Sequence, residues 1–333
     1  MKLIIPMAGR GTRVRPHSNT VPKPLLPVAG TMIVERLVET FIRTMDRSID
    51  EIVYILGPDF GADIKGPLQE MSERHGAVCT FRMQKVALGT AHAVYCAEQD
   101  LEGEVIIAFA DTLFDSKEVF RVEGADSVIW LKKVEDPSRF GVAVYEGDQI
   151  TGFVEKPQEF ISDLAIIGVY YFKEGEKLKE ELAYVIDNDI KGPGGEYFLT
   201  EALDRMIRQG KIFKTATVDE WLDCGTLPAW LETTGIIVEK EASDAVADFP
   251  ESTIIPPVYL GQGVVIEGST IGPHVSIEAG VQIKGSTISN SIVREQAQLS
   301  GCVIDQSTVG AHTELTNYTG VIHAGDHSII SSK

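Results

Sequence analysis

Apolar residues in the first third of the chain alternate between short continuous runs and helical spacing. Runs at 2–7, 51–56, 77–83 and 104–110 predict buried strands. Helical spacing predicts helices at 32–45, 62–74 and 90–98, and we expect Gly66-Pro67 to interrupt the second of these. This alternation implies a sheet with parallel strands, covered by helices on both faces.

The middle of the chain is richer in strand patterns. The predicted strands are 127–134, 141–146, 150–154 and 166–172, and the predicted helices are 176–186, 196–208 and 227–240. We therefore expect an α/β domain built on a Rossmann-like mixed sheet.

After about residue 250 the pattern changes to a short repeat, and no Trp or Phe occurs from Ser252 onward. An aliphatic residue recurs at every fifth or sixth position. These residues are Ile254, Leu260, Ile266, Ile271, Ile277, Ile283, Ile288, Val293, Leu299, Ile304, Val309 and Leu315. A helix needs steps of three and four, and a β-sandwich would not explain so regular a step. The repeat is typical of a parallel β-helix, so we expect two domains, 1–245 and 250–333.

Composition narrows the setting and the partners. The apolar runs are too short for a membrane span or a signal peptide. The four cysteines are scattered and form no CxxC pair, which argues against disulfides and zinc. We expect a soluble cytoplasmic protein with no membrane partner. A net charge of −19 also argues against a nucleic acid partner.

A basic segment at the N-terminus departs from this acidic background. Residues 1–34 contain five Lys or Arg residues and no Asp or Glu, which indicates a local anion site. Gly9 and Gly11 follow the first strand, where backbone N–H groups can approach a phosphate. Val14 excludes both the dinucleotide fingerprint and the Walker loop. Arg13 and Lys23 are close enough in sequence to neutralise phosphates, and prolines stiffen the chain around Lys23.

The segment Gly9-Arg10-Gly11-Thr12-Arg13, together with Pro22-Lys23-Pro24-Leu25-Leu26-Pro27-Val28, resembles the signature of the sugar-1-phosphate nucleotidyltransferases. The thymidylyltransferase and uridylyltransferase types are the most similar, and the repeat resembles the left-handed β-helix of hexapeptide-repeat proteins. The resemblance implies that the glycine-rich loop wraps the nucleotide. The implied nucleotide-binding residues in this region are Ala8, Gly9, Gly11, Thr12, Arg13 and Lys23.

Further motifs of the family follow in order. The segment 84–91 resembles the base-reading segment, which implies nucleotide contacts for Gln84, Gly89 and Thr90. Phe140-Gly141-Val142 and Glu155-Lys156-Pro157 resemble sugar-binding motifs. The implied sugar-phosphate residues are Gly141, Glu155, Lys156 and Gly168. Asp111 and Asp223 match the two metal-binding aspartates, which implies a Mg²⁺ cofactor.

The expected reaction is attack of a sugar 1-phosphate oxygen on the α-phosphorus of a nucleoside triphosphate, with release of pyrophosphate. The expected catalytic residues are Arg13, Lys23, Asp111, Lys156 and Asp223. The substrate pair stays open. The run from Leu88 to His92 favours UTP, the domain layout equally favours dTTP, and the favoured sugar is of glucose type. Two departures from the family pattern are Ala110 before the first metal aspartate and Thr112 after it.

Three other functions remain. One is mannose-1-phosphate guanylyltransferase, which shares the layout. A second is a non-catalytic regulatory subunit, although such a subunit should have lost the phosphate and metal groups that are present here. The third adds acyl transfer from coenzyme A in the β-helix. Its candidate bases are His274, His312, His323 and His327, and the cations available for the cofactor are Lys284, Arg294 and Lys333. We expect the β-helix instead to serve a homo-oligomer or to cap the catalytic domain.

Overall fold

A nine-stranded mixed sheet organises the first part of the chain in the computed structural model, which describes residues 1–9, 11–138, 140–147, 149–241, 249 and 251–332. The strands are, in spatial order, β5 (Val78–Met83), β4 (Glu51–Leu56), β1 (Lys2–Pro6), β6 (Val105–Ala108), β11 (Leu164–Phe172), β8 (Ser127–Lys133), β12 (Phe213–Thr217), β10 (Gln149–Glu155) and β9 (Gly141–Glu146). The first four strands are parallel, and β11 runs antiparallel to both β6 and β8. The expectation of a mixed sheet is confirmed.

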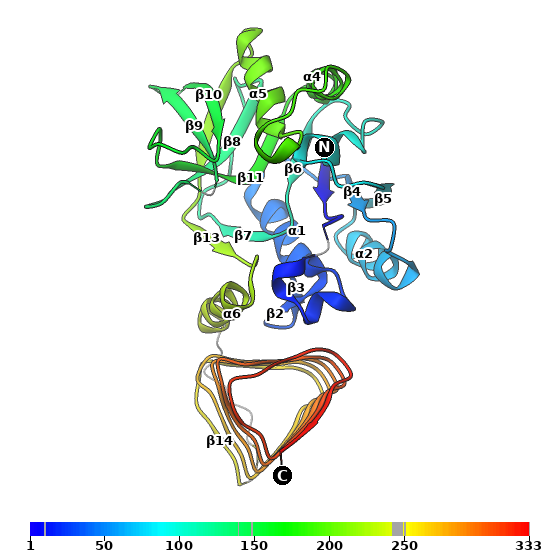
Figure 1. Cartoon of the computed structure of the whole chain (residues 1–333), viewed down its shortest axis with the longest axis vertical. Helices are drawn as coiled ribbons and strands as arrows, with labels where there is room; N and C mark the ends of the chain where they lie inside the picture. The colour runs from blue at the N-terminus through cyan, green and yellow to red at the C-terminus, as the bar shows by residue number, and fades with distance from the viewer. Residues whose placement is uncertain (10, 139, 148, 242–248, 250, 333) are drawn as a thin grey trace. The chain divides into compact units, whose positions relative to one another are not determined.

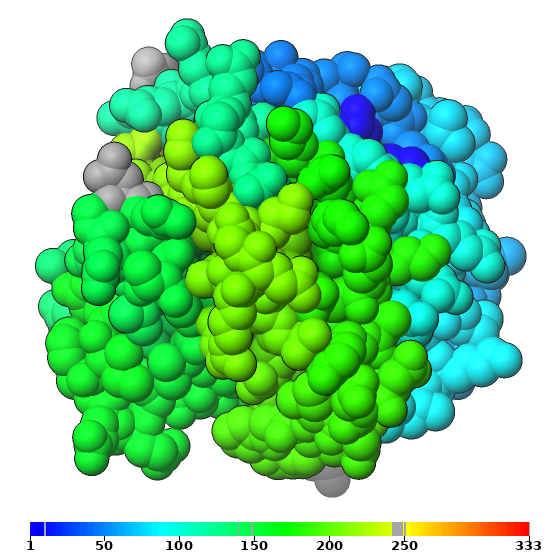
Figure 2. Space-filling model, turned by 90° about the horizontal axis from the view of Figure 1, so that it is seen from above, coloured from blue at the N-terminus to red at the C-terminus, as the bar shows by residue number. Residues whose placement is uncertain are grey.

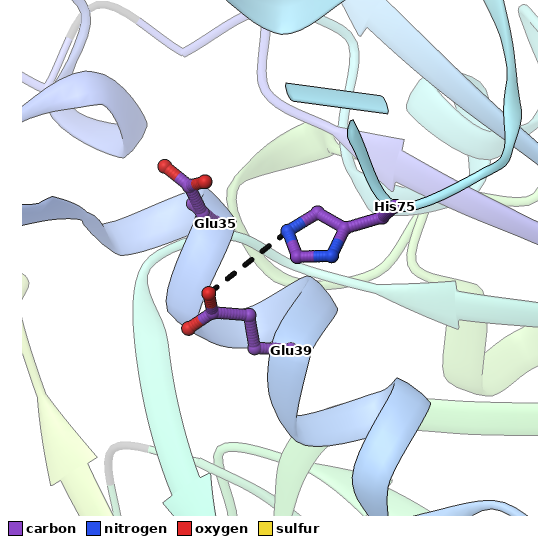
Figure 3. A group of neighbouring side chains, drawn as sticks. All are labelled: Glu35, Glu39 and His75. Atoms are coloured by element: carbon purple, nitrogen blue, oxygen red, sulfur yellow. Dashed lines mark ion pairs between the residues drawn. The ribbon is translucent and has the colours of Figure 1, made fainter. Parts of the chain in front are cut away.

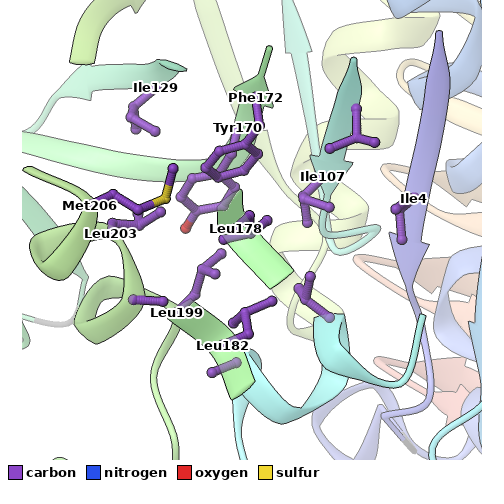
Figure 4. Packing of buried hydrophobic residues seen from close by; sticks show 14 of the residues in the cluster. Ile4, Ile107, Ile129, Tyr170, Phe172, Leu178, Leu182, Leu199, Leu203 and Met206 are labelled. Atoms are coloured by element: carbon purple, nitrogen blue, oxygen red, sulfur yellow. The ribbon is translucent and has the colours of Figure 1, made fainter. Parts of the chain in front are cut away.

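Helices cover one face of this sheet and bury the apolar side chains that point to that face (Figure 1). They are α3 (Thr90–Tyr95), α4 (Gly175–Asp187) and α5 (Leu199–Arg208). Figure 4 shows Tyr170 of β11 beside Leu203 and Met206 of α5. Side chains alternate along a strand, so Trp130, which follows Ile129 on β8, points to the other face and packs on Phe120.

Two more helices of the N-terminal half are α1 (Ile33–Thr44) and α2 (Ala62–Arg74). The predicted interruption of α2 is wrong, because the helix continues through Pro67. Proline removes the bond to the carbonyl four residues earlier. Here that carbonyl belongs to Asp63 in an exposed first turn, where water can bond it instead.

Several short strands had no signal in the sequence pattern. They are β2 (Pro27–Val28), β3 (Thr31–Met32), β7 (Thr112–Asp115) and β13 (Glu220–Asp223), besides β12 in the large sheet. The strand predicted at 104–110 is also shorter, since β6 ends at Ala108 and Asp111 lies between β6 and β7. The remaining predicted elements up to α6 (Leu227–Glu241) are found within a few residues of their expected bounds.

The C-terminal repeat forms three parallel five-stranded sheets, stacked as coils with a triangular outline (Figure 1). One face consists of β14 (Thr253–Ile254), β17 (Thr270–Ile271), β20 (Thr287–Ser289), β23 (Val303–Asp305) and β26 (Thr319–Gly320). The second consists of β15 (Val258–Leu260), β18 (Val275–Ile277), β21 (Ile292–Val293), β24 (Thr308–Val309) and β27 (His323–Ala324). The third consists of β16 (Val265–Glu267), β19 (Gln282–Lys284), β22 (Gln298–Ser300), β25 (Glu314–Thr316) and β28 (Ile329–Ser331).

The predicted aliphatic residues occupy equivalent places in successive coils. On the first face Ile254 pairs with Ile271, Ile271 with Ile288, and Ile288 with Ile304. The predicted aliphatic series from position 254 to 315 packs together in one core that runs through the coils. The β-helix is confirmed, in the arrangement expected for the left-handed hexapeptide-repeat type.

Contacts between residues divide the chain into two compact units. Unit 1 is Met1–Gly9 with Leu37–Trp221, and unit 2 is Arg10–Arg36 with Leu222–Lys333. The predicted domain limits at 245 and 250 fall on residues outside the described part of the chain. Residues 11–34 of the N-terminal basic segment and the helix α6 both belong to the unit that contains the β-helix. Among the described residues, none of the helices has the length and apolar character needed to cross a membrane.

Candidate active site

In unit 1 the candidate residues lie around a buried tyrosine of β11. The Tyr170 side chain is buried, and burial raises the pKa of its phenol well above the ordinary value. The negative charges of Glu155 and Asp111 raise this pKa further, so both carboxylates lie near the same phenol. The structure therefore brings a predicted sugar-binding residue and a predicted metal ligand together.

Asp111 is held by the connection between β6 and β7. The N–H of Phe109 donates to the carbonyl of Gly168 on β11 at 3.0 Å, which fixes the chain two residues before Asp111. Gly168 has a φ of +83°, a conformation that glycine adopts at little cost. The ring of Phe109 packs on Tyr170 with centroids 6.4 Å apart. Gly168 thus shapes the backbone that presents Asp111, in addition to its predicted place in the sugar-phosphate site.

Glu155 and Lys156 end β10 beside one another. The Lys156 Nζ lies 3.8 Å from Glu155 Oε1 and 5.3 Å from the centre of the Phe198 ring. Burial raises the pKa of Glu155, while Lys156 and a hydrogen bond from Thr200 act to lower it. The Lys156 side chain is half exposed, so its ammonium group can meet an anion from solution while Glu155 offers an acceptor for hydroxyl groups.

Gly141 makes room for the Glu155 carboxylate. A Cβ added at Gly141 would lie 3.0 Å from Glu155 Oε2 and 3.2 Å from Ile166 Cδ1. Contacts this short force neighbours to shift. The motif residue at position 141 therefore acts on the position of Glu155 through its lack of a side chain.

The predicted base-reading segment is joined to the residues before α5. Gly89 has a φ of +113°, and a Cβ there would lie 2.4 Å from the carbonyl oxygen of Tyr197. The N–H of Ala91 donates to that carbonyl at 2.9 Å, and the N–H of Leu199 donates to the Thr90 hydroxyl at 2.9 Å. The Thr90 hydroxyl thus accepts a hydrogen bond at the start of α5. The sequence had predicted only a nucleotide contact for this residue.

Gln84 follows β5 and is buried. Its Nε2 lies 3.1 Å from Nδ1 of His92, and burial lowers the pKa of His92. The backbone N–H of Gln84 donates to Leu56 at the end of β4. The side-chain amide is thereby fixed at the carboxyl edge of the parallel strands, where α/β proteins bind ligands.

In unit 2 the glycine-rich segment is compact around Lys23. Gly11 has a φ of +60°, and a Cβ there would lie 2.9 Å from the Cβ of Lys23. The Ser18 hydroxyl donates to the Gly11 carbonyl at 2.6 Å. Lys23 is buried, whereas Arg13 and Thr12 are exposed. Arg10 lies outside the described residues.

Ala8 and Gly9 are the last residues of the N-terminal segment of unit 1. They follow β1 and Met7, whose N–H donates to the Ile55 carbonyl. Among the described residues, nothing lies within 4 Å of a Cβ added at Gly9. The described part of the chain would therefore leave room for a side chain at this position.

Asp223 meets Arg13 at Gly225. The N–H of Gly225 donates to Asp223 Oδ1 at 2.7 Å. A Cβ on Gly225 would lie 2.8 Å from Asp223 Oδ1 and 3.3 Å from Arg13 Nη2. The Asp223 carboxylate is exposed, and its carbonyl accepts a bond from the Thr233 hydroxyl of α6 at 2.7 Å. Its hard oxygen atoms suit Mg²⁺, as do those of Asp111 in unit 1.

A pair of His75 and Glu39 elsewhere in unit 1 involves none of these residues. His75 Nε2 lies 3.9 Å from the Glu39 carboxylate of α1, the helix that also carries Glu35 (Figure 3). The Glu39 side chain is half exposed, and neither residue belongs to a predicted motif. We read the pair as a surface ion pair.

Sequence reasoning missed four residues of the unit 1 site. They are Tyr170, Tyr197, Phe198 and Thr200. The only available signal was the turn-rich Gly192-Pro193-Gly194-Gly195 before Tyr197, which marks a loop but gives no partner.

Figure 2 shows a surface on which the green segments of the middle of the chain lie beside blue and cyan segments of the first 100 or so residues.

Comparison with known proteins now bears on this arrangement. The model of the nucleotidyl transferase family matches residues 2–240. The chain belongs to this family. The sequence motifs predicted a sugar-1-phosphate nucleotidyltransferase, and curated relatives and solved structures confirm that prediction.

Among curated relatives, a glucose-1-phosphate thymidylyltransferase of Streptomyces griseus is 29% identical over 98% of both chains. The low-salt glycan biosynthesis nucleotidyltransferase Agl11 of Haloferax volcanii is 30% identical over 73% of this chain and 67% of its own length. The bifunctional protein GlmU of Methanococcus maripaludis is 30% identical over 68% of this nucleotidyltransferase, which spans 51% of that protein.

Solved structures agree on the fold. A UDP-glucose pyrophosphorylase complexed with UDP-glucose matches with a TM-score of 0.59 and 22% identity, over 72% of this chain and 99% of its own. A Bacillus anthracis structure described as a putative glucose-1-phosphate thymidylyltransferase matches with a TM-score of 0.58 and 23% identity, over 74% and 98%. The fold of this nucleotidyltransferase is therefore that of the sugar pyrophosphorylases.

Proposed function

We propose that this nucleotidyltransferase transfers a nucleotidyl group from UTP or dTTP to a glucose-type sugar 1-phosphate and releases pyrophosphate. The relative from Streptomyces griseus, which matches almost end to end, supports both the thymidine nucleotide and glucose. A zebrafish relative described as mannose-1-phosphate guanylyltransferase catalytic subunit beta is 28% identical over 80% of this chain. Because of that relative, GTP with mannose 1-phosphate is the second substrate pair to test.

The observation that carries the proposal is the convergence of Glu155, Lys156 and Asp111 near Tyr170. A sugar 1-phosphate has hydroxyl groups beside a phosphate. Glu155 would accept hydrogen bonds from the hydroxyls, and the half-exposed Lys156 would neutralise the phosphate. A carboxylate and an ammonium held 3.8 Å apart match these two parts of one small molecule.

The residues of unit 2 would bind the triphosphate. Arg13 and Lys23 supply positive charge in a segment without acidic residues, and Gly11 lets the backbone approach phosphate closely. The sugar phosphate is already an anion, so its attacking oxygen needs no general base. The task of the chain is to hold two anions in line and to neutralise their charge.

Asp111 and Asp223 would hold Mg²⁺, whose chemistry when bound is to act as a Lewis acid on the α-phosphate. The Gly225 N–H fixes the Asp223 carboxylate, and the Phe109–Gly168 hydrogen bond fixes the turn before Asp111. The Asp223 carboxylate is thus oriented by the backbone, and the chain that leads to Asp111 is fixed, before any ion binds.

The β-helix is poorly equipped for acyl transfer from coenzyme A. In its described part, Lys284 pairs with Glu267 at 3.1 Å, and the buried Arg294 pairs with Asp326 at 3.1 Å. The buried Arg294 is not available to the cofactor phosphates, which leaves Lys284 as the one accessible candidate cation in the described part of the β-helix, since Lys333 lies outside the described residues. His312 and His327 stack on each other with centroids 5.0 Å apart. We therefore assign the reaction to the nucleotidyltransferase part alone.

A pyrophosphate-release screen tests the proposal. ATP, CTP, GTP, UTP and dTTP are each offered with glucose, N-acetylglucosamine and mannose 1-phosphates in the presence of Mg²⁺. We expect release with UTP or dTTP and a glucose-type sugar. Lys156→Met should lower kcat/KM about 10²–10³-fold, by analogy with loss of a transition-state donor. Lys133→Met is the matched control, because Lys133 is an exposed lysine that pairs with Asp163. A folded protein that releases pyrophosphate with none of the pairs would refute the proposal.

A further inference from the structure

The segment that carries Arg13 and Lys23 has little regular structure of its own. We call residues 11–30 the signature loop. It consists of three single-turn 3₁₀ helices, Thr12–Val14, His17–Asn19 and Lys23–Leu25, followed by the two residues of β2. Such short elements do not stabilise themselves. The loop needs partners elsewhere in unit 2 to keep one conformation.

Its first partner is the fourth coil of the β-helix. His17 is fully buried, and its Nε2 lies 2.8 Å from the hydroxyl oxygen of Thr308, which lies 2.9 Å from Nδ1 of His323. The Thr308 hydroxyl has one proton and can donate to only one imidazole. Nδ1 of His17 has no hydrogen-bond partner among the described residues, and an unpaired acceptor is better tolerated in the interior than an unpaired N–H. This assigns the donor role to Nε2 of His17, and the Thr308 hydroxyl then bonds to Nδ1 of His323 as donor or acceptor.

A buried ion pair of the β-helix provides the second contact. The Thr20 hydroxyl donates to Asp326 Oδ2 at 2.5 Å. Asp326 also accepts from Arg294 Nη1 at 3.1 Å and from the N–H of Ala311 at 2.9 Å. The side chains of Arg294 and Asp326 are each only 4% exposed. The loop thus bonds to a carboxylate that is fixed by two groups of the β-helix, from two coils.

Close packing reinforces these polar contacts. A Cβ added at Gly325 would lie 3.0 Å from Pro16 Cβ, so the loop lies directly on this corner of the coil. The ring of Trp230, from α6, meets the His17 ring edge-on at 5.2 Å, and its Nε1 donates to the Pro27 carbonyl at 2.8 Å. At the far end of the loop, the N–H of Gly30 faces Glu278 Oε1 of the β-helix at 3.3 Å.

We propose that the β-helix is the support that holds the signature loop in its nucleotide-binding conformation, with Thr308 and Asp326 as positioning residues. The inference rests on the proposed function, because it assigns Arg13 and Lys23 to the triphosphate. A loop held in place loses less conformational entropy when it binds, so the support strengthens nucleotide binding without touching the nucleotide. The β-helix is then part of the nucleotide site in addition to any role in oligomers.

The test replaces one hydroxyl in the full-length protein. Thr308→Val keeps the shape of the side chain and removes both hydrogen bonds of the His17–Thr308–His323 relay. We expect the KM for the nucleoside triphosphate to rise about tenfold, whereas the KM for the sugar 1-phosphate and kcat should change less than about twofold. Backbone amides of residues 12–27 should exchange hydrogen faster. Unchanged KM and exchange in Thr308→Val would overturn the proposal.

Ser286→Ala is the matched control. Ser286 is buried, and its hydroxyl makes two hydrogen bonds inside the β-helix, to Lys284 and Cys302. This variant should lose similar stability but keep the KM for nucleotide and the exchange of residues 12–27. An equal effect of both variants would reduce Thr308 to a purely structural residue and refute the positioning role.

A second pair of variants guards against a folding defect. His17→Gln keeps an N–H near the position of Nε2, so this variant should retain most of the nucleotide affinity of the wild-type protein. His17→Leu, which has no N–H in its side chain, should lose it. Hydrogen exchange reads the loop without turnover. If the wild-type protein turns over no substrate pair, the proposed function fails. Faster exchange in Thr308→Val and His17→Leu alone would still support the structural part of the inference, and no change in exchange would refute that part as well.

Discussion

In unit 1 the candidate site residues follow directly from strands of the central sheet, whereas in unit 2 they depend on a loop that rests on the β-helix. Glu155 is the last residue of β10, and Tyr170 lies within β11. Arg13 and Lys23, by contrast, lie in single turns on either side of His17, which bonds to Thr308 almost 300 positions away. The ladder bonds of a sheet position the first group, and side-chain contacts position the second.

This difference predicts different sensitivities. Strand residues are held by many backbone bonds, so few single side chains matter for their position. The loop relies on a small number of buried polar contacts, and each such contact is costly to break. Substitutions in the β-helix and changes of pH should therefore act on unit 2 far more than on unit 1.

The largest effect should come from breaking the buried ion pair beneath the loop. Asp326→Asn removes the buried counter-charge of Arg294, whose remaining acidic partner is the more exposed Glu295 at 3.0 Å, and should lower the free energy of unfolding by about 3 kcal/mol. Urea unfolding of the full-length protein measures it. Glu267→Gln is the control, since it breaks an exposed pair with Lys284 worth under about 1 kcal/mol. Equal losses in the two variants would contradict the account of the support.

The stability of unit 2 should also depend on pH in two opposite ways. Burial lowers the pKa of His17 from 6.5 to about 4, with smaller effects of Arg294, Asp326 and His323. Since the unfolded chain binds the proton more readily, stability falls as pH drops from 6.5 towards 4. Burial raises the pKa of Glu278 from 4.5 to about 7, so here stability falls as pH rises from 4.5 towards 7.

Two variants separate these effects. His17→Gln should remove the loss on the acid side, and Glu278→Gln should remove the loss towards neutral pH. Each loss is up to about 3 kcal/mol for a shift of this size. Thermal unfolding, followed from about pH 4 to about pH 8, measures both losses of stability. The same slopes in the wild-type protein and both variants would show that these side chains do not set the pH dependence.

A smaller effect is expected in unit 1, where backbone fit matters. Gly89→Ala places a Cβ 2.4 Å from the Tyr197 carbonyl at a φ of +113° and should cost about 1–3 kcal/mol. Gly76→Ala is the control, because Gly76 also has a positive φ, +77°, but nothing described lies within 4 Å of its Cβ. Only Gly89→Ala should also weaken nucleotide binding. Equal losses in stability and binding would show that the contact with Tyr197 is unimportant.

Sequence patterns predicted the two regions unequally well. In the β-helix each coil repeats the same burial, so the aliphatic series from Ile254 to Leu315 could be placed residue by residue. In unit 1 the main strands and helices were predictable from periodicity, but Pro67 and the end of β6 were not. Rules that consider only neighbouring residues could not indicate that the first turn of α2, which tolerates Pro67, is exposed. They could not indicate either that the residue after Ala108 bonds to Gly168.

The site was predictable only where a motif carries it. The motifs named Asp111, Glu155 and Lys156. The structure places Asp111 and Glu155 near Tyr170, which no spacing indicated, and Lys156 beside Glu155. The contacts of Thr308 and Asp326 with the signature loop were equally invisible, because they join positions far apart in sequence with no pattern that links them. Long-range contacts of this kind require a structure. The roles of the motif residues in catalysis stay predictions.

The central claim is that Asp111 and Asp223 serve one Mg²⁺-dependent reaction. Its most direct test measures pyrophosphate release against Mg²⁺ concentration for the wild-type protein, Asp111→Asn, Asp223→Asn and the double variant. We predict that each single variant loses about 10²–10³ in kcat and that the double variant is hardly worse, because residues that act as a unit are not additive. Undiminished release by either folded single variant, or losses that multiply in the double variant, would contradict the claim.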